Sequence, residues 1–225
     1  MNTPEASDKT GLFIVFEGAN GSGKSSAART AADHFKEAGY DVALTREPGG
    51  TPQAEKLREF LLDPTFSLDP HEQTLLFMVA RRSHLRQVIL PAVSRGAIVI
   101  CDRYLASTLV YQTLRPEGGA PATIDEIRKA HKTWCWNTKP DLQILLDIDY
   151  KTANERRNMR FAEADRFESE DPDYEMQCIN RYAESAQLLG FPGSTIDARQ
   201  TQEEVSSNAI SLIQNMIEAR NISPA

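Results

Sequence analysis

A glycine-rich segment near the start of the chain has the spacing of a phosphate-binding loop. Residues 18–25 read G-A-N-G-S-G-K-S and match the pattern G-x-x-x-x-G-K-[ST]. Glycines at these positions let backbone N–H groups surround phosphate oxygens, and the positive end of a following helix faces the same charge. Lys24 could reach the β- and γ-phosphates, and the Ser25 hydroxyl could bind a magnesium ion. The residues expected to contact a nucleoside triphosphate here are Gly18, Ala19, Asn20, Gly21, Ser22, Gly23, Lys24, Ser25 and Ser26.

Segments of strand and helix character flank this loop in the order that the motif requires. The apolar run 12–16 predicts a buried strand before the loop. The alanine-rich stretch 26–38 predicts a helix that ends at Gly39. Because motif and context agree, a phosphate-binding loop is favoured over a chance glycine turn.

Further strands alternate with helices along the rest of the chain. Strands are expected at 41–45, 97–101, 141–148 and 194–197, and helices at 51–62, 70–93, 104–114, 124–136, from Tyr150, and at 174–189 and 202–219. This order predicts an α/β fold, a doubly wound five-stranded parallel sheet flanked by helices, in one domain over 1–225. Ligands in such sheets bind beyond the carboxyl ends of the strands. The charged stretch 161–173 lacks apolar periodicity, so we expect a lid within about 156–173.

The composition limits the possible partners of the protein. The 225 residues carry a formal net charge of −7, which argues against a nucleic-acid polymer as partner. Three scattered cysteines form no disulfide or zinc pattern and are typical of reduced thiols. Residues 1–10 are polar, and no run is apolar enough for a membrane span. We therefore expect a cytoplasmic protein that does not bind membranes and that takes a small phosphorylated ligand.

An arginine follows the second expected strand. Arg46 stands before a Pro-Gly-Gly turn, and its planar guanidinium could hold a phosphate by two parallel hydrogen bonds. A surface arginine beside an ordinary turn is the alternative.

Phe77 and Arg81 are four residues apart and share a helix face, where the ring could stack on a nucleobase and the arginine could bind a carbonyl or phosphate. Packing of Phe77 in the core is the alternative there.

Two further groups of charged residues have spacing that suits phosphate chemistry. Asp102 follows an apolar strand, the arrangement that organises magnesium and its waters, although it could also cap the next helix. Arg103 follows it directly and could contact the transferred or accepting phosphate. Arg156, Arg157 and Arg160 precede Asp165 and Arg166. As part of the lid they could close over the phosphates, or they could lie on a solvated helix face.

Five motifs together resemble the thymidylate kinase family. They are F-E-G-x-x-G-x-G-K-S, T-R-E-P-G-G-T, L-L-F-x-x-x-R, D-R-Y-x-x-S-T-x-x-Y-Q and P-D-L-x-x-x-L-D-I, in this order over nearly the whole chain. The resemblance implies a P-loop NTPase fold with a lid, and ATP- and Mg²⁺-dependent phosphorylation of dTMP to dTDP by a homodimer. A kinase for dUMP or a 5-substituted deoxyuridylate is the alternative, and a nucleotide-binding regulatory module without turnover is a third.

The resemblance also implies roles for individual residues. Arg46 and Arg103 would hold the acceptor phosphate, Phe77 would stack on thymine, and Arg81 would bind its carbonyl edge. The residues implied for the acceptor are Asn20, Arg46, Glu47, Pro48, Phe77, Arg81, Arg103, Ser107, Thr108, Tyr111, Gln112 and Asp165. Those implied near the metal are Ser25, Glu47 and Asp102, and those near adenine are Arg156 and Arg199. The implied catalytic residues are Lys24, Asp102, Arg103, Arg157 and Arg160.

Two positions of the phosphate-binding loop distinguish this chain within the resemblance. Gly21 occupies the position where one form of the family carries its catalytic arginine, so the chain resembles the form with that arginine on the lid. Arg160 is the first candidate for it and Arg157 the second. Asn20 occupies a position that usually carries a carboxylate beside the acceptor sugar. This change leaves the identity of the acceptor base open and is the support for the regulatory alternative.

Overall fold

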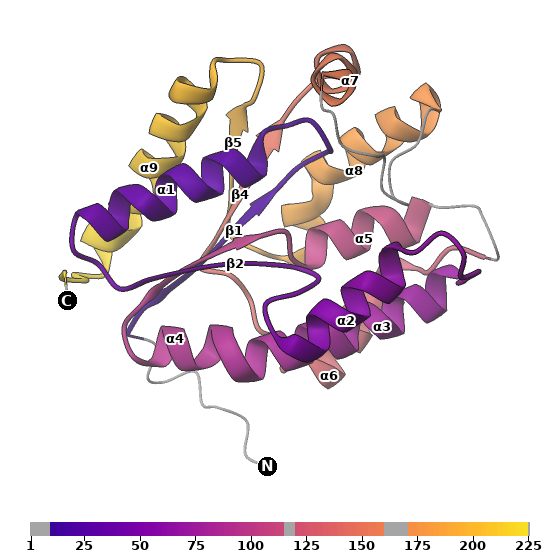
Figure 1. Cartoon of the computed structure of the whole chain (residues 1–225), viewed down its shortest axis with the longest axis horizontal. Coiled ribbons are helices and arrows are strands. Elements are labelled where there is room, and N and C mark those ends of the chain that lie inside the picture. The colour runs from indigo at the N-terminus through magenta and orange to yellow at the C-terminus, as the bar shows by residue number, and fades with distance from the viewer. Residues whose placement is uncertain (1–9, 115–119, 160–170, 225) are drawn as a thin grey trace.

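The computed structural model describes residues 10–114, 120–159 and 171–224, which form a sheet covered by helices on both faces (Figure 1). Its five strands follow the order β2-β3-β1-β4-β5, and all neighbours are parallel. The strands are β1 (Leu12–Glu17), β2 (Val42–Arg46), β3 (Ile98–Asp102), β4 (Leu142–Asp147) and β5 (Gly193–Asp197). The predicted doubly wound α/β fold is therefore confirmed.

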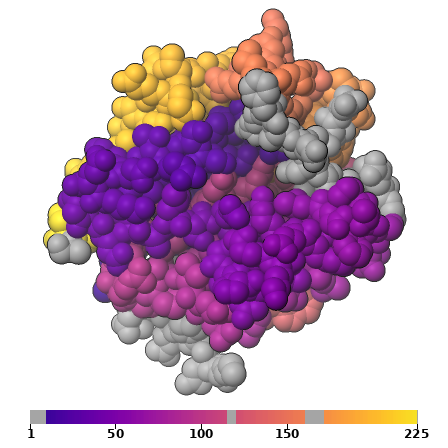
Figure 2. All heavy atoms as spheres, viewed as in Figure 1, coloured from indigo at the N-terminus to yellow at the C-terminus, as the bar shows by residue number. Residues whose placement is uncertain are grey.

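Two helices, α1 (Lys24–Glu37) and α9 (Gln202–Ala219), cover one face of the sheet. Figures 1 and 2 show them side by side, and both contribute to the same core cluster as Ile14 of β1. Phe13 and Val15, the neighbours of Ile14, belong to a second cluster on the opposite face. Successive side chains of a strand point to opposite faces, so this fully apolar strand serves both cores.

Seven helices complete the described fold. They are α2 (Pro52–Leu62), α3 (Pro70–His84), α4 (Leu90–Ser94), α5 (Leu105–Leu114), α6 (Ile124–Trp134), α7 (Tyr150–Asn158) and α8 (Pro172–Leu189). Local sequence sets several of their starts: Asp69 and Glu72 form a capping box at α3, with Pro70 at the first turn. Across the described helices, none is long and apolar enough to cross a membrane.

The single helix expected over 70–93 is interrupted. After α3, a π-helical turn at Leu85–Ile89 leads into α4. Pro91 has no N–H and cannot donate to the carbonyl four residues earlier, so the regular ladder is broken there. The other expected elements are present, with ends that differ by a few residues.

The strand register brings the candidate site together at one edge of the sheet. Arg46 at the end of β2 pairs with Asp102 at the end of β3, and Asp102 pairs with Phe16 of β1. The loop after β1 therefore lies beside the polar residues that end the two neighbouring strands.

Gly21 at the middle of this loop is in a conformation that favours glycine. Its φ is +91°, and a Cβ atom added there would lie 2.5 Å from the carbonyl oxygen of Ala153 in α7. A side chain at this position would collide with backbone, so the loop in this conformation requires glycine.

Candidate active site

The glycine-rich loop forms one wall of a polar cavity of about 210 Å³. Gly23 is in the left-handed conformation and α1 begins directly after it, so the positive end of the helix faces the cavity. Lys24 is buried, and its Nζ lies 3.4 Å from the carbonyl oxygen of Ala19. The cavity is lined by Asn20, Gly23, Lys24, Ser25, Ser26, Arg46, Glu47, Arg58, Asp102 and Arg103.

Ser25 and Asp102 meet on the floor of this polar cavity. The Ser25 hydroxyl donates to Oδ2 of Asp102 at 2.5 Å. Oδ1 of Asp102 is buried and has no hydrogen-bond partner within the described residues. A hydroxyl beside a carboxylate with an unused oxygen fits Mg²⁺, which takes few protein ligands and completes its shell with phosphate and water. Over the described chain no cluster of three or more metal-binding side chains competes with this pair.

A second cavity lies next to the polar one and contains the aromatic residues of the site. It is lined by Asn20, Glu47, Pro48, Arg58, Leu62, Phe77, Arg81, Arg103, Tyr104, Ser107, Thr108 and Tyr111. Asn20, Glu47, Arg58 and Arg103 line both cavities, so they mark the boundary between them. Phe77 is 8% exposed and lines this cavity, so it packs in the core and also reaches the site.

Arg81 is a fully buried cation on the floor of the second cavity. Its Nε donates to Oε2 of Glu47 at 2.7 Å, and one Nη donates to Oγ1 of Thr108 at 3.0 Å. Its guanidinium carbon lies 4.8 Å from the centre of the Tyr104 ring. Burial disfavours the charge of Arg81, but the Glu47 carboxylate together with Tyr104 and Cys135 outweighs this effect and raises the pKa of the guanidinium. Arg81 is therefore held charged and in one orientation.

Arg103 stands at the boundary of the two cavities. Its φ is +72°, a conformation that is strained for a residue with a side chain, and its N–H donates to the carbonyl of Phe16 at 2.9 Å. The guanidinium donates to Ser107 at 2.9 Å, to the Tyr182 hydroxyl at 2.7 Å and to Oδ1 of Asn20. These acceptors are uncharged, so the positive charge stays available to an anionic ligand.

Glu17, at the end of β1, is hydrogen-bonded to residues at the start of α5. Its carboxylate accepts hydrogen bonds from the backbone N–H groups of Tyr104 at 2.7 Å and Ser107 at 3.2 Å, and from the Ser107 hydroxyl at 2.7 Å. Complete burial raises the pKa of Glu17, although Arg103 and these donors oppose that shift. We predicted no role for Glu17 from the sequence, although a carboxylate at the end of an apolar strand could have indicated one.

Two other site residues were missed because no sequence pattern marks them. Arg58 on α2 lines both cavities and donates to the carbonyl of Pro48 at 3.1 Å. The Tyr182 hydroxyl on α8 accepts from Arg103 at 2.7 Å. Each is an ordinary residue of a helix whose neighbours become evident only in the fold.

The residues expected to bind the acceptor have different surroundings. Pro48, Ser107, Thr108 and Tyr111 line the second cavity. Gln112 is fully buried, and its side-chain amide donates to Oε1 of Gln73 at 2.9 Å, while its own Oε1 has no hydrogen-bond partner within the described residues. The contact of Gln112 with the acceptor therefore stays a prediction.

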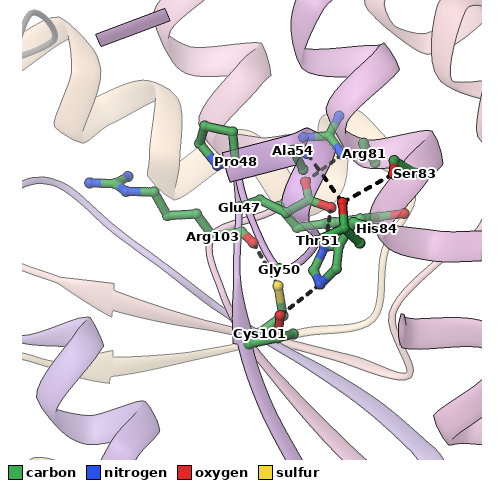
Figure 3. Close-up of polar contacts among 12 residues, drawn as sticks. Glu47, Pro48, Gly50, Thr51, Ala54, Arg81, Ser83, His84, Cys101 and Arg103 are labelled. Carbon is green, nitrogen blue, oxygen red and sulfur yellow. Dashed lines mark hydrogen bonds and ion pairs between the residues drawn. The ribbon is translucent and has the colours of Figure 1, made fainter. Parts of the chain in front are cut away.

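Both carboxylate oxygens of Glu47 bind side chains of α3. One oxygen accepts from Arg81, and the other lies 3.1 Å from Nδ1 of His84 (Figure 3). Glu47 also lines the polar cavity with Ser25, so its expected place near the metal stays a prediction. Arg46, which shares the polar cavity, is paired with Glu55 at 3.0 Å on its exposed side.

The arginines expected near the lid and the adenine have varied surroundings. Arg157 forms a buried ion pair with Glu175 at 2.7 Å that joins α7 to α8, and it lines neither cavity of the site. Arg156 donates to the carbonyl of Ala198 at 2.7 Å, and Arg199 is paired with Asp197. Two other expected residues, Arg160 and Asp165, lie outside the described residues.

The fold and the glycine-rich loop define a P-loop nucleotide-binding protein, in which two cavities adjoin beside that loop. Comparison with known proteins agrees. The model of the thymidylate kinase family matches residues 16–209. The chain is 36% identical over 211 residues to the thymidylate kinase of Ectopseudomonas mendocina, covering 93% of this chain and 98% of that protein.

Other relatives have similar values. The chain is 35% identical over 212 residues to the thymidylate kinase of Gluconobacter oxydans, covering 94% of this chain and 98% of that protein. It is 37% identical over 210 residues to the thymidylate kinase of Pseudomonas fluorescens, covering 93% and 98%. The chain therefore belongs to the thymidylate kinase family, as its five motifs predict.

Proposed function

We propose that the protein transfers the γ-phosphoryl group of ATP to the 5′-phosphate of dTMP, giving dTDP and ADP. One observation carries this proposal: a phosphate-binding cavity and an aromatic cavity adjoin and share Asn20 and Arg103. The triphosphate of ATP fits the first cavity and the thymidine part of dTMP fits the second. The two phosphates that react would then meet at the boundary.

The donor half of the site uses the phosphate-binding loop. Its backbone N–H groups and Lys24 would hold the β- and γ-phosphates, with Lys24 leaving the carbonyl of Ala19. Ser25 and Asp102 would hold Mg²⁺, and the unpartnered oxygen of Asp102 supports this assignment. When bound, the metal would supply positive charge that neutralises the terminal phosphates. Arg156 and Arg199 remain our candidates for the adenine end.

The acceptor half of the site uses the aromatic cavity. Phe77 would stack on the pyrimidine ring, while Arg81 and Thr108, already bonded to each other, would face its carbonyl edge. Tyr111 would lie against the sugar and disfavour a 2′-hydroxyl. Arg103, Arg46 and Arg58 would bind the 5′-phosphate, with Arg46 exchanging its exposed partner Glu55 for it.

The reaction needs no covalent enzyme intermediate. An oxygen of the dTMP phosphate would attack the γ-phosphorus of ATP, and the bond to the β,γ-bridging oxygen would break as ADP leaves. The arginines would align the acceptor oxygen and spread the charge of the transferring group. Lys24 would neutralise charge on the donor side. Of the lid arginines we assign the catalytic role to Arg160, because Arg157 is held by Glu175.

The proposal also includes an oligomeric state and a cellular location. Homodimer formation follows from the family resemblance, and exposed Leu75 and Val79 on α3 support an apolar contact surface. A cytoplasmic location is supported by three free, buried cysteines. Sedimentation of the purified protein tests the dimer, and localisation of a tagged chain tests the compartment.

An ADP-release assay with dTMP, dUMP, UMP, CMP and dGMP tests the reaction. We expect dTMP to give the highest kcat/KM, with weaker turnover of dUMP because it lacks the 5-methyl group. A higher kcat/KM for dUMP would establish the deoxyuridylate alternative. Binding of ATP and dTMP without any turnover would establish the regulatory module and overturn the proposed reaction.

A further inference from the structure

His84, the last residue of α3, is a fully buried imidazole that lies beneath the acceptor half of the site. Its Nδ1 lies 3.1 Å from Oε1 of Glu47, and its Nε2 lies 2.7 Å from Oγ1 of Thr45. Figure 3 shows the Glu47 carboxylate between His84 and Arg81. His84 therefore bonds to β2 and to the turn after it through opposite sides of one ring.

The chemistry of the partners assigns a proton to Nδ1 of the imidazole. The Glu47 carboxylate accepts from Nε of Arg81, and an ionised carboxylate can only accept, so Nδ1 of His84 must donate to it. Nδ1 is a donor in the neutral ring with this tautomer and in the charged ring alike. Nε2 and the Thr45 hydroxyl form the second hydrogen bond of the ring.

These contacts form one continuous hydrogen-bonded chain. It runs from Thr45 through His84 to Glu47, which also receives Arg81, and Arg81 in turn donates to Thr108 on α5. The guanidinium of Arg81 is thus fixed by bonds at Nε and at one Nη. Its Nε bond depends on the orientation of Glu47, and that orientation depends on His84.

The turn after β2 is shaped around the His84 ring. Gly50 has a φ of +81°, and a Cβ atom added there would lie 2.5 Å from both Cδ2 and Nε2 of His84. Thr45, Glu47 and Gly50 therefore contact the same imidazole from one short segment. This independent fit supports a specific place for the ring rather than general core packing.

We propose that His84 is a positioning residue for the acceptor nucleotide, acting through Glu47 on Arg81. The proposal rests on the proposed function, in which Arg81 faces the acceptor base. Loss of the His84–Glu47 hydrogen bond frees the carboxylate to rotate and lets Arg81 leave its orientation. Acceptor binding weakens as a result, while ATP binding does not, because Arg81 lines the acceptor cavity and not the phosphate cavity.

Three substitutions separate positioning from packing. The amide nitrogen in His84→Asn takes the place of Nδ1, so it retains the donor to Glu47. The longer His84→Gln places its amide near Nε2, retaining the Thr45 side alone, and His84→Leu retains neither. Replacement of an exposed histidine of the same helix, His71→Asn, is the matched control.

The measurements are KM and kcat for each substrate, the Kd of the acceptor, and the unfolding temperature. We expect the acceptor KM and Kd of His84→Asn to stay within about twofold of wild type. His84→Gln and His84→Leu should raise both by about tenfold. The KM for ATP should stay unchanged in all variants, and His71→Asn should match wild type throughout.

Two outcomes would overturn the proposal. Either His84→Asn and His84→Gln have the same acceptor Kd, or the KM for ATP rises in parallel with that for the acceptor. If His84→Leu fails to fold, the comparison of Asn with Gln still decides. Turnover of dTMP by the wild type tests the proposed function separately. If the wild type does not bind dTMP, the acceptor Kd values of the variants are compared with whichever monophosphate of the panel it does bind.

Discussion

The hydroxyl of Tyr182, midway along α8, lies 2.7 Å from Nη1 of Arg103 at the end of β3. The same hydroxyl lies 2.9 Å from Oγ of Ser107, so α8, β3 and α5 meet at a single side chain. Arg103 is strained in its backbone and depends on such partners to hold its guanidinium at the boundary of the two cavities.

Tyr182→Phe should therefore weaken the placement of Arg103 without leaving a cavity. Loss of a hydrogen bond to a charged group is expected to lower kcat/KM for dTMP by about tenfold. The KM for ATP should remain unchanged. Steady-state kinetics with each substrate varied gives the answer, and Tyr40→Phe, at the opposite end of the sheet, is the control. An unchanged kcat/KM for dTMP would remove Tyr182 from the site.

Asn20→Asp should change both stability and acceptor binding. Oδ1 of Asn20 accepts from Arg103, whose acceptors in the described chain are uncharged, so an aspartate would supply a counter-ion to a buried cation. We expect the free energy of unfolding to rise by about 1–2 kcal/mol and the KM for dTMP to rise about threefold to tenfold. Chemical denaturation and kinetics measure the two. Tighter dTMP binding would show that the new carboxylate binds the acceptor sugar more strongly than it competes with the dTMP phosphate for Arg103.

The two lid arginines should respond differently to truncation. Arg157 and Glu175 are a buried pair, so Arg157→Ala should reduce the free energy of unfolding by about 3 kcal/mol and change kcat little. The double variant with Glu175→Ala should recover part of that loss, as a double-mutant cycle measures. If Arg157→Ala lowers kcat and leaves the free energy of unfolding unchanged, Arg157 and not Arg160 would be the catalytic arginine.

Arg160→Ala should act on the reaction itself. A lid arginine that stabilises the transferring phosphoryl group is worth on the order of a thousandfold in kcat. We expect kcat to fall by at least about a hundredfold while the dTMP and ATP KM values change little. Single-turnover kinetics would show whether the chemical step is slowed. Activity equal to wild type would exclude Arg160 as the catalytic residue.

Glu17 predicts a pH dependence of stability. Its pKa is raised above the usual 4.5 by burial, so the folded chain binds a proton more readily than the unfolded chain. As pH rises from the pKa of Glu17 in the unfolded chain to its higher pKa in the folded chain, the free energy of unfolding falls. Above the folded-state pKa this loss remains. Glu17→Gln removes this contribution, so its stability relative to wild type should increase as pH is raised from about 4 towards neutrality. Urea unfolding across that range measures the difference, and a constant difference would contradict the cause given.

Sequence alone predicted those site residues that local motifs contain. Lys24, Ser25 and Asp102 sit in short patterns next to apolar strands, and parallel pairing then brings the strand ends together. Boundaries were less exact, because the break after α3 depends on how the ladder adapts to Pro91.

The supporting contacts could not be predicted in the same way. Arg103 and Tyr182 are separated by 79 residues, and Arg81 and Glu47 by 34. Only the packing of α8 and α3 against the sheet makes them neighbours. The sequence likewise could not show that Glu47 binds Arg81 and His84, because both partners lie on α3.

The transfer of label from γ-labelled ATP tests the central claim most directly. With Mg²⁺ and dTMP present, the account predicts that label appears in dTDP at the rate at which ADP is released, and that Lys24→Ala abolishes both. Removal of Mg²⁺ with a chelator should stop the transfer, and its return should restore it. Label released only as inorganic phosphate, or at a rate independent of dTMP, would contradict a site built for two nucleotides.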